Sequence, residues 1–347
     1  MLNSLRMQRN LRLTLEPWSP EYDTSLHADP NQAKAIEDVE LEVEFSVWGK
    51  VRPADYRVDF SQLYFIDGRR RLEGRVWNTL DGGVIAPGLL GTLAVGAVTT
   101  KHDTLTPARV VDRVLERILI LSGGTGQDLI IENRGHEYGR LEYRYEALNE
   151  TQNLENALMQ RLQFLMRDAE DKLAGGLPLE DALLILDGPL QRRAPDRSMG
   201  YVKTLHTLYV SGQELEVLRQ LEKGERTPVF RIGSRILPRY SWYIRLENTP
   251  EYIQPFAGLV RLEVRDVMGL EWAKSIADWS CRVLPRYSAK AFRDPRAPQQ
   301  LMPIAFLESD LGRRMGDMSI IRRRIQAHLR SQNTREEAPL EPAKNTN

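Results

Sequence analysis

The chain has 347 residues, enough for one large domain or two ordinary ones, and its Lys+Arg and Asp+Glu totals balance at 48 each. This balance excludes a globally basic nucleic-acid-binding protein, so only local clusters of charge can indicate such a partner. A single cysteine, Cys281, excludes an intramolecular disulfide and a zinc site with several thiolates. A helix that spans a bilayer needs about 20 consecutive apolar residues, and no stretch of the sequence approaches this length. We therefore expect a cytoplasmic protein without a membrane partner.

The first part of the chain predicts an extension followed by strands. Residues 1–50 are expected to form an N-terminal extension or arm, in which residues 39–51 alternate apolar and polar like a half-buried strand. Leu63–Ile66 predict a strand that ends at Asp67-Gly68, and residues 71–80 and 91–100 predict two more. Three sequential strands with short turns indicate an antiparallel meander. Residues 108–121 fit a helix or a strand equally well.

The middle and the end of the chain mix helices and strands. Residues 151–174 predict an amphipathic helix with Thr151 as its N-cap and Gly175-Gly176 at its end. The aliphatic run before Asp187 predicts a strand that is buried on both sides. Later elements are a strand over 200–210, a helix over 213–223, a strand pair in 241–247 and 258–264, and helices over 269–283 and 311–330. We expect a mixed α/β core over 51–331 and a disordered tail over 332–347.

Two acids, Asp67 and Asp187, each close an apolar run and precede a glycine. A single Asp-Gly pair is most simply a turn. Two such pairs, separated by a long amphipathic helix, favour a different interpretation, because the carboxyl ends of strands are where α/β sheets build their sites. Carboxylate oxygens are the ligands that Mg²⁺ and Mn²⁺ prefer. The sequence therefore predicts a metal site that contains both aspartates.

A third acidic ligand is expected from the helix that precedes Asp187. Glu170 and Asp168 flank its apolar stripe on opposite sides, whereas Asp171 points away from it. Glu155 lies in the first turn, where the helix dipole already explains an acid. Glu170 is the preferred candidate and Asp168 the alternative.

Basic residues accompany both Asp-Gly pairs. Arg69, Arg70 and Arg71 follow the first, and the second is followed by Arg192, Arg193 and, on the next predicted strand, Lys203. Arginine runs are usually solvated surface, but two runs beside the same pair of acids predict contacts with phosphates of a nucleic acid.

The order and spacing of these motifs resemble the NurA nuclease family. The resemblance is carried by "FIDGRRRLEG", "RDAEDKLA" before "LLILDGPL", "GYVK", and the later strand pair, and it covers about residues 58–310. It implies an RNase H-like mixed sheet flanked by helices, in which an antiparallel meander is joined by parallel strands. It also implies a homodimer, cleavage of DNA with Mn²⁺ or Mg²⁺, and partnership with a HerA-type hexameric ATPase in resecting DNA ends, in repair or anti-phage defence.

Residue by residue, Asp67 and Asp187 match the family's metal-holding aspartates, Glu170 best matches the helix glutamate, and Lys203 matches the lysine of "GYVK". Family members often carry a histidine near the C-terminal end of the core, but residues 290–325 contain none. Glu308, in "PIAFLE", is the candidate replacement.

Two functions follow as hypotheses. The first is a metal-dependent deoxyribonuclease with Asp67, Glu170 and Asp187 as catalytic metal ligands. The alternative is a non-catalytic dimeric adaptor that binds DNA or a ring ATPase, which the missing histidine favours and the retention of both aspartates disfavours.

Overall fold

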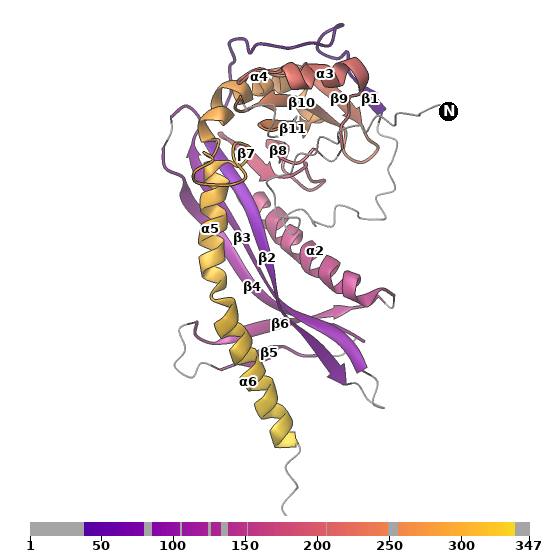
Figure 1. Ribbon diagram of the computed structural model, residues 1–347, viewed down its shortest axis with the longest axis vertical. Helices are drawn as coiled ribbons and strands as arrows, with labels where there is room; N and C mark the ends of the chain where they lie inside the picture. Colours follow the sequence, from indigo (N-terminus) through magenta and orange to yellow (C-terminus); the bar gives the residue numbers. More distant parts are fainter. Residues whose placement is uncertain are drawn as a thin grey trace, which may run out of the picture. The chain divides into compact units, whose positions relative to one another are not determined.

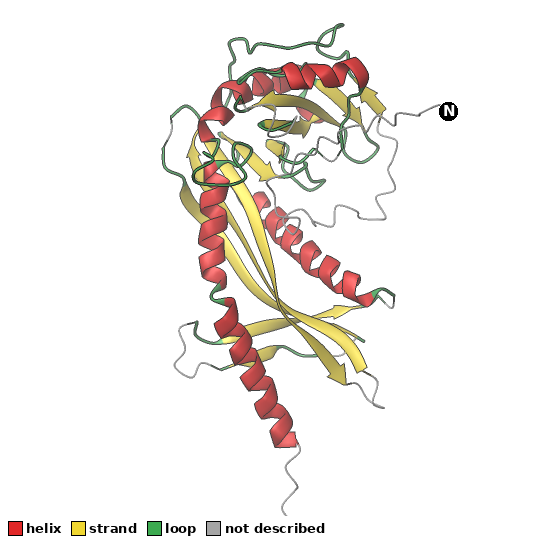
Figure 2. Cartoon of the chain, in the orientation of Figure 1, coloured by secondary structure: helices red, strands yellow, loops and turns green. Residues whose placement is uncertain are grey.

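A computed structural model describes residues 38–79, 85–104, 106–123, 126–132, 138–150, 152–205, 207–248 and 256–336. Within them, eleven strands form a mixed sheet that is flanked by helices, as expected for a mixed α/β protein (Figures 1 and 2). The chain divides into two compact units. The first comprises Met1–Leu63, Thr100–Pro107 and Leu179–Pro303, and the second Tyr64–Thr99, Ala108–Pro178 and Ile304–Asn347.

The first unit is a six-stranded portion of the sheet with two α-helices and a 3₁₀ turn. Its elements are β1 (Asp38–Glu40), β7 (Ala182–Asp187), β8 (Ser198–Val202), α3 (Gly212–Gln220), β9 (Phe230–Gly233), β10 (Arg239–Arg245), β11 (Leu259–Arg265), η2 (Asp266–Met268) and α4 (Leu270–Tyr287). The strand order is β1-β9-β10-β11-β8-β7. All neighbours are antiparallel except β7 and β8, which are parallel.

The second unit is built mainly from five strands and three helices. These are β2 (Gln62–Thr79), β3 (Ile85–Lys101), β4 (Arg109–Ser122), β5 (Leu129–Ile131), β6 (Leu141–Leu148), α2 (Leu154–Gly175), α5 (Met302–Met315) and α6 (Met318–Glu336). The strand order is β2-β3-β4-β6-β5, with β4 and β6 parallel and the pairs β3–β4 and β5–β6 antiparallel. The predicted meander is wrong in its division, because Leu63–Ile66 and residues 71–79 belong to the single strand β2, while residues 91–100 lie in β3. The ambiguous segment 108–121 is the strand β4.

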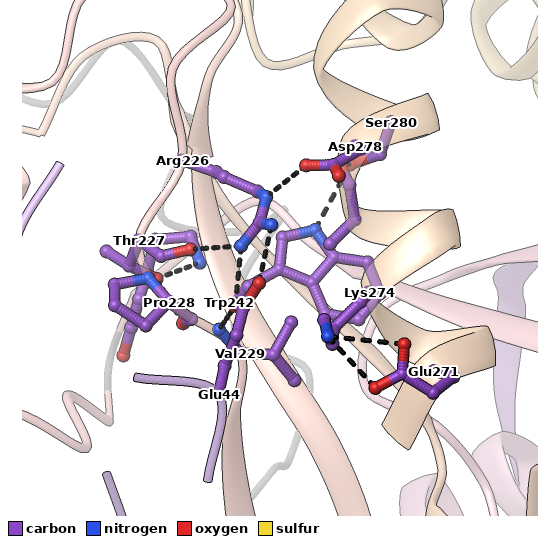
Figure 3. Close-up of polar contacts among 12 residues, drawn as sticks. Glu44, Arg226, Thr227, Pro228, Val229, Trp242, Glu271, Lys274, Asp278 and Ser280 are labelled. Carbon is purple, nitrogen blue, oxygen red and sulfur yellow. Dashed lines mark hydrogen bonds and ion pairs between the residues drawn. The ribbon is translucent and has the colours of Figure 1, made fainter. Parts of the chain in front are cut away.

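The predicted strand over 39–51 is wrong beyond Glu40, because a buried ion network fixes this segment as irregular chain. Glu44 accepts hydrogen bonds at 2.8 Å from both terminal nitrogens of Arg226 and one at 2.6 Å from the Val229 amide. Arg226 also donates to Asp278 of α4 at 2.7 Å (Figure 3). The guanidinium is 2% exposed, so a missing partner would leave a buried charge uncompensated. The segment is therefore held by the side chain of Glu44 and by the paired backbones of Val51 and Arg226, rather than by a strand ladder.

The prediction that Asp67-Gly68 ends a strand is also wrong. The strand β2 runs without interruption from Gln62 to Thr79 and includes both residues. Gly68 does not adopt the left-handed backbone that a turn glycine often supplies. Its role is steric, since a Cβ there would stand 2.3 Å from Oε1 of Glu170 and 3.0 Å from Cγ of Met166. The glycine therefore admits helix α2 to the surface of the strand.

The boundaries of two helices and one strand differ from prediction. The expected helix over 311–330 is divided by Gly316, which has a φ of 79° and separates α5 from α6. Helix α6 continues to Glu336, so the expected tail cannot begin at residue 332. The strand expected over 200–210 is β8 and ends at Val202.

The remaining expectations concern the helices α2 and α3. Helix α2 ends at Gly175 as predicted, and α3 confirms the expected helix over 213–223. The residue that caps the N-terminus of α2 is Asn153. Thr151, residues 1–37 and residues 337–347 lie outside the described residues.

Candidate metal centre

Asp67 lies on β2 between two helices of the second unit, and its neighbours show which face it occupies. Gly68 contacts α2, and Arg70 donates to Gln163 of α2. Arg69 instead donates from Nη1 to the carbonyl oxygen of Glu308 on α5, at 3.0 Å. Because side chains alternate along a strand, Asp67 shares the face of Arg69 and points to the α5 side.

Each of the three arginines after Asp67 has a partner inside the second unit. Arg71 donates to the carbonyl oxygens of Gly316 at 2.7 Å and Met315 at 2.8 Å, and to Glu73 at 2.7 Å. Burial, and next the charge of Arg167, lower the pKa of Arg70. The run therefore joins β2 to α2 on one face and to α5 and the start of the α5–α6 link on the other.

Glu308 is a buried acid on α5, with 7% of its surface exposed. The preceding residue, Leu307, is also buried, whereas Phe306 is exposed. Glu308 therefore lies on the side of α5 that faces the protein. A carboxylate oxygen of Glu308 lies within 4.8 Å of one of Asp67. Two carboxylates at such a separation repel each other unless a cation or a proton offsets their charge.

Glu170 and Asp168, the two acids of α2 considered as ligands, point to different surroundings. Oε1 of Glu170 is the atom nearest to the position that a Gly68 Cβ would occupy, which places this carboxylate beside the residue after Asp67. Asp168 pairs with Lys172 at 2.7 Å, one helical turn away. Geometry therefore brings Glu170, but not Asp168, to the Asp67-Gly68 peptide.

Asp187 is the last residue of β7, where the aliphatic run predicts it. The following residue, Gly188, has a φ of 107° and turns the chain, and its amide donates to the Tyr201 carbonyl at 2.9 Å. The buried Glu263 accepts from the Leu190 amide at 3.0 Å and so holds the far end of the turn. Asp187 is thus presented by a strand end whose backbone is fixed on both sides.

Lys203 is the direct partner of Asp187. Its Nζ lies 2.5 Å from Oδ2 of Asp187 and 2.5 Å from Oε1 of Gln300, and 11% of its side chain is exposed. Burial, and next the charge of Asp187, raise the pKa of the fully buried Tyr201 on β8. The aspartate is therefore the anionic centre of a polar cluster on β7 and β8.

Asp67 and Glu308, both in the second unit, form a pair of possible metal ligands. Each offers one carboxylate oxygen, and these two oxygens lie within 4.8 Å of each other. Hard oxygen donors suit Mg²⁺ or Mn²⁺, so the residues present fit a divalent cation. Glu170 is not a member of this pair. The sequence signal for Glu308 is a lone acid in an otherwise apolar helical stretch, "PIAFLE".

The other predicted phosphate-binding residues lie in the first unit. Arg192 and Arg193 are exposed, in the loop that follows Asp187. They are therefore accessible to a ligand, whereas Lys203 is already engaged by Asp187 and Gln300.

Among the described residues, no helix combines the length and the apolar character needed to cross a membrane.

Comparisons with known proteins give a likeness at the level of the fold alone. No protein-family model matches the chain, and no curated protein matches it. Among solved structures, the chain is similar to the crystal structure of the NurA nuclease from Sulfolobus solfataricus, with 11% sequence identity and a TM-score of 0.47. The similarity covers 85% of this chain and 89% of that one.

Proposed function

We propose that this protein is a deoxyribonuclease that depends on a divalent cation, Mn²⁺ or Mg²⁺. The observation that carries the proposal is the pair formed by Asp67 and Glu308 of the second unit, whose carboxylate oxygens lie within 4.8 Å of each other. Two mutually repelling carboxylates are costly to hold together unless a cation binds between them. Asp187 joins them in this proposal as the second aspartate of the sequence motifs.

The residues around the group have separate tasks in this proposal. Asp67, Asp187 and Glu308 hold the cation, which when bound supplies charge stabilisation at the phosphate and activation of water. Lys203, within hydrogen-bond reach of Asp187, fixes the orientation of that carboxylate. Glu170 lies beside Gly68 on the α2 side of β2, opposite the face of Asp67, and therefore has no ligand role in this proposal.

The substrate and partners are proposed from the sequence motifs that resemble the NurA family. We infer that the substrate is DNA, that Arg192 and Arg193 contact its phosphates, and that the protein acts as a homodimer. Its partner in resecting DNA ends is proposed to be a HerA-type hexameric ATPase. The exposure of both arginines in the loop after Asp187 supports their part in this proposal.

The test combines metal binding with DNA cleavage. Purified protein is titrated with Mn²⁺ in a calorimeter and incubated with linear single- and double-stranded DNA. Asp67→Ala, Asp187→Ala and Glu308→Ala are each expected to weaken Mn²⁺ binding and to lower cleavage about 100-fold or more. Asp55→Ala is the matched control, because the side chain of Asp55 is fully exposed and its pairing with Arg282 spans 3.5 Å.

The outcomes separate the two functional hypotheses. Cleavage that persists in all three variants would show that the site is assigned wrongly. A wild-type protein that neither binds Mn²⁺ nor cuts DNA, alone or with a ring ATPase, would favour the non-catalytic adaptor instead.

A further inference from the structure

Helix α5 contains a glycine, Gly312, whose missing side chain leaves room for a guanidinium. A Cβ at this position would stand 2.6 Å from Nη1 of Arg69 and 3.6 Å from its Cζ. A separation below 3 Å is shorter than van der Waals contact allows, so any other residue here would displace Arg69. Glycine in the interior of a helix is itself unfavourable. Its presence in α5 therefore has a steric use.

The same nitrogen of Arg69 makes the hydrogen bond to α5. Nη1 donates to the carbonyl oxygen of Glu308 at 3.0 Å. Residues 308 and 312 are one turn apart on a helix and lie on one face. Arg69 thus binds α5 at the turn between Glu308 and Gly312. The bond uses the backbone of Glu308 rather than its side chain.

The contact also fixes the distance between two acids. Asp67 and Arg69 are two residues apart on β2, so their side chains share a face and are about 7 Å apart along the strand. With Arg69 bound at the carbonyl of Glu308, the carboxylates of Asp67 and Glu308 lie within 4.8 Å of each other. A charge-assisted hydrogen bond is well suited to this, because it resists the repulsion between the two acids.

We propose that Arg69 and Gly312 are positioning residues that hold Glu308 at bonding distance from a cation shared with Asp67. This inference deepens the proposed function and rests on it for the role of the cation. The contact between Arg69 and α5, however, exists without the cation and can be tested without it.

The first experiment is a double-mutant cycle on the metal-free protein, measured as the midpoint of urea unfolding. Gly312→Ala improves helix propensity but displaces the guanidinium, so in the wild-type background it is expected to raise the midpoint little or to lower it. In an Arg69→Ala background the space is free, and the same substitution is expected to raise the midpoint. Gly175→Ala, at the end of α2 with no atom within 4 Å of the new Cβ, is the matched control and should respond equally in both backgrounds.

The second experiment measures Mn²⁺ affinity in the same variants. Gly312→Ala and Arg69→Ala are each expected to raise the dissociation constant about tenfold, the usual effect of removing a group that orients a metal ligand. Gly175→Ala should leave it unchanged. Adding Gly312→Ala to Arg69→Ala should cause no further loss of Mn²⁺ affinity, because the contact between Arg69 and α5 is already absent.

The results distinguish this inference from the proposed function. If Gly312→Ala raises the unfolding midpoint equally with and without Arg69, the contact between Arg69 and α5 does not exist and the inference is overturned. If the cycle shows coupling but Gly312→Ala binds Mn²⁺ as tightly as the wild type does, the contact exists but does not position Glu308, which also overturns the inference. If the wild type binds no Mn²⁺, the proposed function fails, and with it the positioning role, while coupling in the cycle would still establish the contact.

Discussion

Glu73 is a buried acid of the second unit that accepts four hydrogen bonds, although its sequence context gives no sign of this. Its side chain is fully buried. One carboxylate oxygen accepts from Arg71 at 2.7 Å, Thr92 at 2.6 Å and Arg117 at 2.8 Å, and the other accepts from the hydroxyl of Tyr143. Burial, and next the charge of Glu73, raise the pKa of Tyr143 well above its usual range. One carboxylate therefore neutralises two guanidinium groups inside the protein.

Removing the charge of Glu73 is expected to destabilise the protein strongly. Glu73→Gln leaves two cations, one of them only 8% exposed, without their anion, and should lower the free energy of unfolding by about 3–5 kcal/mol. Urea denaturation at neutral pH measures this. Glu155→Gln is the control, since Glu155 and its partner Arg75 are 71% and 65% exposed and should contribute less than about 1 kcal/mol. Equal effects of the two substitutions would contradict the role given to Glu73.

At the scale of the element, strand β2 joins the helices of the second unit through opposite faces. Gly68 and Arg70 meet α2, whereas Arg69 and Arg71 meet α5 and the residues that link it to α6. The strand thus determines which helix each side chain can reach. A change in the contact with α2 should be separable from a change in the contact with α5.

Two glycines of β2 provide the test of the contact with α2. Gly68→Ala places a methyl group 2.3 Å from a Glu170 oxygen and 3.0 Å from a Met166 carbon, so α2 or its side chains must shift. We expect a loss of about 1–3 kcal/mol, as for other overpacked sites. Gly74→Ala, on the same strand with nothing within 4 Å, should be neutral or slightly stabilising. Thermal unfolding of the two variants is the measurement, and a stable Gly68→Ala protein would show that α2 does not press on this residue.

The elements themselves show what the sequence can predict. It places Asp187 correctly at a strand end, because an aliphatic run followed by a glycine at positive φ is a local signal. It places Asp67 at a strand end wrongly, because the same signal arises when glycine serves packing against a distant helix. Glu170 and Glu308 are separated by more than a hundred residues, and only tertiary packing decides which of them reaches Asp67. Local chemistry suggests the two aspartates as candidate ligands, but it cannot rank the third acid.

At the scale of the whole molecule, each unit is assembled from three separate segments of the chain. No single stretch corresponds to either unit, which explains why no linker rich in proline or serine separates them in the sequence. Truncation at any one point would therefore remove part of a unit rather than release the other. Probes that report on one unit are more informative than deletions.

Cys281 is such a probe, because it is the only cysteine and belongs to the first unit. The thiol is 2% exposed, and burial raises its pKa to about 12. The thiolate is the reactive form, so modification by a thiol reagent at about pH 8 should be very slow in the native protein and fast after unfolding in urea. The rate of modification, followed by absorbance, then reports how often the first unit opens. A native rate close to that of a free small thiol would contradict the burial of this residue.

The alternation along β2 also restricts the length of the chain between Asp67 and Glu73. Inserting or deleting one residue there would turn every following side chain to the opposite face of the strand. An insertion directly after Asp67 would direct the arginine that binds the Glu308 carbonyl towards α2, and it would turn Glu73 away from Arg117 of β4. Such a change would disrupt the candidate site and the buried network together. The stretch "DGRRRLE" is therefore expected to tolerate some exchange of residue types but no change in residue number.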